Sequence, residues 1–134
     1  MSFLSLSRGI LRQHPKRVER LIREWMTEAY ERELHRELTK LDESIVEWRR
    51  GAISSGELSH RIHEWERGPS RALFKHYNHG PQDMSVAYAI VLGIMDEEEV
   101  PEGLLKAISG PLEFFRSLQE RDELRGREGA WWRR

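Results

Sequence analysis

Apolar residues recur at helical spacing along most of the chain, and no stretch shows the alternation that a half-buried strand requires. Pro15 suits the first turn of a helix, because its missing N–H would be unpaired there, and Gly51 suits a C-terminal cap. Nothing between them breaks the pattern. It therefore predicts one helix over residues 15–50, about 50 Å long at 1.5 Å per residue. That length exceeds the width of a compact domain of this size, so we expect the helix to protrude.

The apolar residues of this helix fall into two stripes of different phase. The first comprises Val18, Leu21, Ile22, Trp25 and Ala29, and the second, at 4-3-4-3 spacing, comprises Leu34, Leu38, Leu41, Ile45 and Trp48. At 100° per residue the stripes are centred about 150° apart, so a straight helix would bury its two halves against different neighbours. The heptad-like second stripe favours an interface with a second subunit. The alternative is a break near residues 30–33, which would give two ordinary amphipathic helices.

Capping and breaking residues delimit the elements that follow. Ser54 and Glu57 form a capping box, which predicts a helix that begins there and is ended by Gly68-Pro69. A further helix runs from this break to about Asn78, antiparallel to the one before it. Residues 83–95 are apolar on nearly every side, which predicts a buried central helix.

The fold predicted is all-α, a small bundle of about five or six helices with one long protruding N-terminal helix. We expect a single domain over residues 1–134, in which the long helix is preceded by a segment at 1–14. A helical body over 54–125 and an irregular tail over 126–134 follow it.

Composition narrows the possible functions. Cysteine is absent, which excludes disulfides and thiolate metal sites and fits a reducing compartment, so we expect a soluble, cytoplasmic protein. Charged residues make up 34% of the chain while the net charge is only -1, which gives no overall affinity for nucleic acid. The most apolar run, residues 86–95, has half the length needed to span a membrane, so no membrane partner is expected.

Histidines are densest in residues 54–80, in two pairs with i, i+3 spacing. On neighbouring antiparallel helices these pairs could present four imidazoles to zinc, iron or nickel, with a carboxylate one turn from the first histidine. The second Glu-x-x-His of a di-iron site is missing, so we expect no metal and no cofactor. The residues of this alternative site are His60, His63, Glu64, His76 and His79.

Arg71 and His76 match the Arg-x4–6-His spacing of the HEPN ribonucleases, which are small helical proteins that dimerise to cleave RNA without a metal ion. Chance supplies about two such matches in a chain of this composition, and Arg8 with His14 is another. The position after the arginine, usually polar in that family, is Ala72. The pair is therefore retained only as an alternative catalytic site.

Trp131 and Trp132 lie in a charged tail, and such a pair lowers solubility unless it docks on this chain, on a sister subunit or on another protein. With the second stripe, they are the predicted interface residues. The predicted function is a helical protein–protein interaction or regulatory protein, without catalysis, that self-associates as a homodimer or a higher oligomer. The alternatives are the histidine metal site and the HEPN-like ribonuclease.

Overall fold

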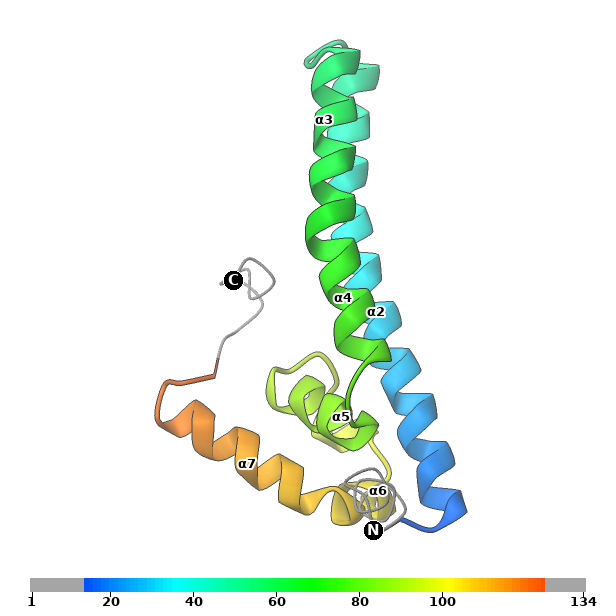
Figure 1. Cartoon of the computed structure of the whole chain (residues 1–134), viewed down its shortest axis with the longest axis vertical. Helices are drawn as coiled ribbons and strands as arrows, with labels where there is room; N and C mark the ends of the chain where they lie inside the picture. Colours follow the sequence, from blue (N-terminus) through cyan, green and yellow to red (C-terminus); the bar gives the residue numbers. More distant parts are fainter. Residues whose placement is uncertain (1–13, 125–134) are drawn as a thin grey trace, which may run out of the picture. The chain divides into compact units, whose positions relative to one another are not determined.

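The computed structural model describes residues 14–124 (Figure 1). No strand occurs in this range, so the all-α class and the long N-terminal helix are confirmed. None of the helices described is both long enough and apolar enough to cross a membrane. The elements are α2 (Lys16–Arg49), α3 (Ser55–Trp65), the π-helical turn η1 (Glu66–Ser70), α4 (Arg71–Asn78), α5 (Gln82–Val91), the 3-10 turn η2 (Glu97–Glu99), α6 (Glu102–Ala107) and α7 (Ser109–Glu120).

Helix α2 is continuous through residues 30–33, so the alternative of a break there is not realised. It is closed by Gly51, whose φ of +81° lies in the left-handed region that favours glycine. The Gly51 N–H donates to the Trp48 carbonyl and the Ala52 N–H donates to the Glu47 carbonyl. These two bonds form a Schellman motif, as the predicted glycine cap requires.

Packing divides the described residues into two compact units, with the boundary between Ala29 and Tyr30 of α2. Unit 1 contains residues 14–29 and 80–124, and unit 2 contains residues 30–79. This boundary coincides with the change of phase between the two apolar stripes. The first stripe therefore packs within unit 1, where Val18, Ile22 and Ala29 are buried.

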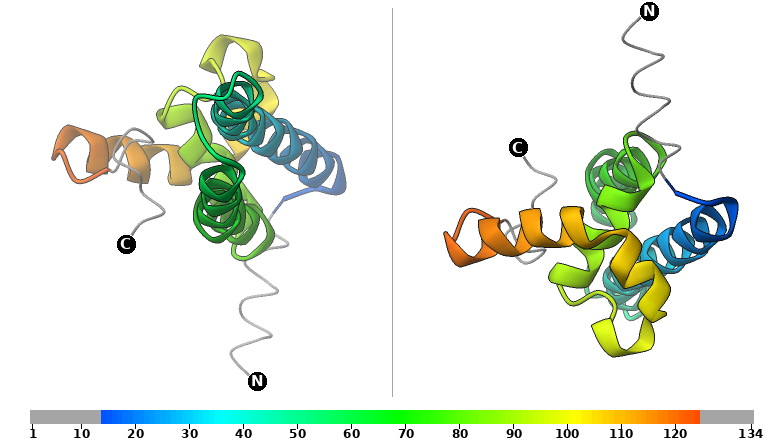
Figure 2. Two further views of the ribbon diagram at one scale, coloured as in Figure 1. Left: turned by 90° about the horizontal axis from the view of Figure 1, so that it is seen from above. Right: turned by 90° about the horizontal axis from the view of Figure 1, so that it is seen from below.

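Helix α5 is the central helix of unit 1, as its apolar composition predicts. Val86, Ala87 and Ala89 are fully buried, and α7 lies against α5 (Figure 2). The rings of Tyr88 and Phe115 meet edge to face with centroids 5.3 Å apart. The helix ends at Val91 rather than at residue 95, because Gly93 adopts a φ of +81° and closes it.

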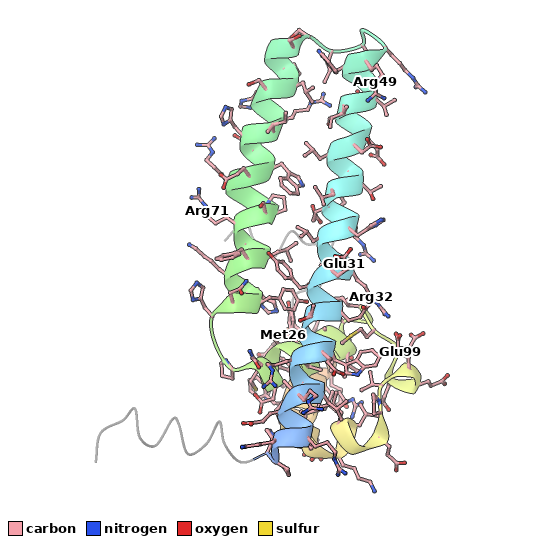
Figure 3. The ribbon with its side chains drawn as sticks, turned by 90° about the vertical axis from the view of Figure 1, so that its right-hand side faces the viewer. Met26, Glu31, Arg32, Arg49, Arg71 and Glu99 are labelled. Carbon is pink, nitrogen blue, oxygen red and sulfur yellow. The ribbon has the colours of Figure 1, made fainter. Side chains whose placement is uncertain are left out.

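Unit 2 is a helical hairpin, in which residues 30–49 of α2 run antiparallel to the rod formed by α3, η1 and α4 (Figures 1 and 3). Ser54 caps α3, since its Oγ accepts a hydrogen bond of 3.0 Å from the Glu57 N–H. Trp48 Nε1 donates to Ser55 Oγ near the turn, also at 3.0 Å. Farther from the turn, Trp65 Nε1 donates to the Glu37 carbonyl at 3.0 Å. The order of these contacts establishes the antiparallel pairing.

The predicted break at Gly68-Pro69 is wrong, because α3 continues into α4 through the π turn η1. Proline lacks an N–H and its ring clashes with the carbonyl four residues earlier, which normally interrupts an α-helix. Here the helix widens over Glu66–Ser70, and the Arg71 N–H donates to the Glu66 carbonyl five residues back. The axis therefore continues past Pro69, and no second antiparallel pair forms at this point.

Candidate interaction surface on the helical hairpin

The four histidines of the alternative metal site lie along one rod and not on facing helices. His60 and His63 belong to α3, His76 belongs to α4 and His79 follows it. Sixteen residues separate His60 from His76, about 24 Å at 1.5 Å per residue. His60 Nε2 is 3.9 Å from Glu64 Oε1 on the exposed face of α3. Within residues 14–124 no three histidine or acidic side chains are grouped closely enough to hold a metal ion, so the convergence considered for this site is wrong.

The alternative catalytic pair is also separated. Arg71 is exposed, its Nη2 lies 3.3 Å from Glu66 Oε1, and it points away from α2 (Figure 3). His76 is half-buried, and burial lowers its pKa. Five residues correspond to about 140° of helical rotation, so the two side chains occupy different sides of α4. The geometry of one chain does not support a catalytic pair.

The second stripe of α2 is divided between the hairpin core and solvent. Glu33, Glu37 and Trp48 make the hydrogen bonds to the opposite rod and mark the side of α2 that faces it. Leu38 and Ile45 are rotated from that side by about 100°. Leu38 is 45% exposed and Trp48 is 41% exposed, whereas the remaining residues of the stripe are half-buried. The rod of the same chain therefore covers one side of the stripe and leaves the other side open.

Two exposed apolar residues of the opposite rod lie on this open side. Ile62 of α3 is 42% exposed and Phe74 of α4 is 53% exposed. Each is rotated by about 50–80° from the residues of its own helix that face α2. Leu38 and Ile45 are displaced in the same rotational sense from the residues of α2 that face the rod. In an antiparallel pair of helices, displacements of the same sense bring side chains to the same side of the pair. We call this surface the apolar side. Its residues are Leu34, Leu38, Ile45, Ile62 and Phe74, together with Trp48 at its edge, where Nε1 bonds to Ser55 of the rod while 41% of the residue stays exposed.

The π turn aligns the two halves of the rod. In an unbroken α-helix Phe74, twelve residues after Ile62, would lie about 120° away from it. A π turn accommodates one extra residue, and this reduces the rotation between Ile62 and Phe74 by about 100°. Phe74 then lies within about 20° of Ile62, and Leu73 and Tyr77 return to the side that faces α2, where both are buried.

The other side of the hairpin is ionic and is held by Arg61. Its Nη1 donates to Ser44 Oγ at 3.1 Å and to Glu47 Oε2 at 3.0 Å on α2. Its Nε donates to Glu57 Oε2 at 3.0 Å within α3. These polar groups satisfy one another across the two helices. The hairpin therefore has one side with internal ionic partners and one side with exposed apolar residues.

Glu33 is a buried acid that was not among the predicted site residues. It is 3% exposed, and its Oε2 accepts a hydrogen bond of 2.6 Å from the Tyr77 hydroxyl. The Tyr77 ring stacks on Tyr30 with centroids 5.1 Å apart. Burial raises the pKa of Glu33, partly offset by the hydrogen bond from Tyr77 and by Arg36. A sequence signal existed, because Glu33 continues the buried row of Val18, Ile22 and Ala29 by one further i+4 step.

Trp131 and Trp132 lie outside the described residues, so docking by this pair stays a prediction. Comparisons with models of protein families, with curated proteins and with solved structures find no match to the chain. Its function is therefore inferred from its own residues.

Proposed function

We propose that this chain is a helical interaction protein that self-associates through the apolar side of its hairpin and has no catalytic role. The observation that carries the proposal is the placement of the exposed large apolar side chains. Of the five among the described residues, four belong to the hairpin. Leu38, Ile62 and Phe74 lie on one side of it, and Trp48 lies at the edge of that side. Single exposed apolar residues are ordinary, but a group on one face is typical of an interaction site.

The dimensions of the hairpin suit a second copy of itself. Residues 30–49 span about 30 Å at 1.5 Å per residue, and two helices side by side are about 20 Å wide. Face-to-face pairing would cover about 600 Å² on each chain, or about 1,200 Å² in total. This is the lower end of the range for specific protein interfaces. Two hairpins packed in this way would form a four-helix bundle.

Charge also favours self-association of the hairpin. Residues 30–79 contain nine acidic and nine basic residues, so the formal net charge of the hairpin is zero. Two copies therefore approach without long-range repulsion. A partner with a strong charge of either sign would gain little electrostatic attraction to a hairpin without net charge. This balance favours a like partner over a polyanion or a polycation.

Light scattering coupled to size-exclusion chromatography tests the proposal. The full chain should have twice the mass of one chain. Leu38→Glu or Ile62→Glu should weaken association at least ten-fold, about 1.4 kcal/mol, because each substitution buries a charge in the interface. Thr39→Glu is the matched control, since Thr39 is exposed and faces away from both the rod and the apolar side. A chain that stays monomeric at high micromolar concentration would contradict the proposal. Equal effects of Leu38→Glu and Thr39→Glu would also contradict it.

A further inference from the structure

We infer that two hairpins pair through α2 in antiparallel orientation, about a two-fold axis level with Leu41. This inference rests on the proposed self-association and specifies its geometry. In a two-fold interface, residue i of one copy contacts residue j of the other, and j contacts i. A helix can therefore pair with an antiparallel copy of itself when its apolar residues are symmetric about one point.

The apolar residues of α2 have this symmetry. Leu34 and Trp48 lie seven residues to either side of Leu41, and Leu38 and Ile45 lie three and four residues from it. In the antiparallel pair Leu34 meets Trp48 of the second copy, and Leu38 meets Ile45. Each contact occurs twice, once on either side of the axis. Large apolar residues thus meet apolar residues along about four turns of helix.

Charges at the two ends of this segment distinguish antiparallel from parallel pairing. Glu31 and Arg49 are eighteen residues apart, which is five full turns, so they lie on the same side of α2 and within about 20° of Leu38. Both are exposed, and within residues 14–124 neither has an ion-pair partner (Figure 3). In the antiparallel pair Glu31 of each copy lies near Arg49 of the other. In a parallel pair Glu31 would face Glu31 and Arg49 would face Arg49.

One like-charge contact opposes the arrangement. Asp42 is exposed, lies on the same edge of the apolar side and is one residue from the proposed axis. Asp42 of one chain would therefore approach Asp42 of the other chain across the two-fold axis. The two Glu31–Arg49 contacts outnumber this single repulsion, whereas parallel pairing would have like charges at all three positions.

Cross-linking tests the orientation, and the absence of native cysteine makes every introduced thiol unique. Full-length Glu31→Cys and Arg49→Cys chains are co-refolded and treated with a short bismaleimide. Antiparallel pairing gives cross-linked dimers in the mixture and none in either variant alone, because the two copies of position 31 lie about 30 Å apart. Cross-linking of each variant by itself would show parallel pairing and would overturn the inference.

Light scattering on the same samples separates this inference from the proposed function. A dimer without any cross-link overturns the antiparallel α2 pairing but not self-association. A monomer overturns both. Charge reversal provides a second measurement, in which Glu31→Arg should weaken the dimer about five-fold and Glu31→Arg with Arg49→Glu should restore it. An equal loss in the single and double variants would contradict the inference.

Discussion

Removing the hydrogen bond between Tyr77 and Glu33 tests how much it stabilises the hairpin at the end away from the turn between α2 and α3. Tyr77→Phe removes the hydroxyl and keeps the ring that stacks on Tyr30. A buried carboxyl then loses a donor at 2.6 Å, which costs about 1–3 kcal/mol. For a chain of this size the melting temperature should fall by roughly 4 °C per kcal/mol. Circular dichroism of wild type and variant during heating measures the difference.

Glu33 also makes the stability of the hairpin depend on pH. Its pKa in the folded chain is raised above the ordinary value of 4.5, so the folded state binds more protons than the unfolded state in the interval between the two pKa values. Stability therefore falls as the pH rises from about 4.5 through the raised pKa. Glu33→Gln keeps the shape of the side chain but cannot ionise. It should lack this fall, so its stability relative to wild type should increase with pH.

Urea unfolding between pH 4.5 and pH 7.5 measures the two profiles. Glu43→Gln is the matched control, since Glu43 is an exposed glutamate of the same helix, and its profile should follow that of wild type. Parallel profiles for wild type and Glu33→Gln would refute the argument from burial. A Tyr77→Phe variant as stable as wild type would show that the hydrogen bond adds nothing to folding.

Three further changes test the hairpin. Deleting Pro69 should leave the melting temperature near that of wild type, because the deletion removes the extra residue of η1 and restores an α-helix of the same phase. Inserting an alanine after residue 70 should instead destabilise the chain, because the insertion turns Leu73 and Tyr77 away from α2. Gly51→Ala should cost about 1–2 kcal/mol in thermal melts, because the position has a φ of +81° although space for a methyl group is open. Asp42→Asn should tighten the dimer in sedimentation experiments, and weaker association would count against α2 pairing with α2.

Much of the fold could be predicted from local patterns. The length of α2 follows from Pro15, Gly51 and the uninterrupted periodicity between them, since each of these acts on the backbone of a few neighbouring residues. The buried character of α5 follows equally directly from its composition. The division of α2 between two units was visible as the phase change between its stripes, because a straight helix cannot bury two sides against one neighbour.

The candidate site could not be predicted to the same extent, because it depends on contacts between distant segments. A glutamate on a helix is ordinarily solvated, and Glu33 is buried because Tyr77 reaches it from a helix forty-four residues away. The histidine site failed for the opposite reason. It required α3 and α4 to be separate helices, and Gly68-Pro69 is a strong local signal for a break that the widened backbone of η1 overrides.

The π turn links the internal packing of the hairpin to the surface that it presents. The rotation that returns Leu73 and Tyr77 to α2 is the same rotation that places Phe74 beside Ile62, so neither alignment can change without the other. A regular α-helix of the same residues, continuing from Leu58 without the widening at η1, would direct Tyr77 about 100° away from Leu58 and Phe74 about 160° away. The hairpin would then lose the partner of Glu33, and the apolar side would end at Ile62. The π turn, which absorbs one residue without changing the phase of the rod, therefore accounts for both the closure of the hairpin and the extent of the surface proposed to bind a second copy.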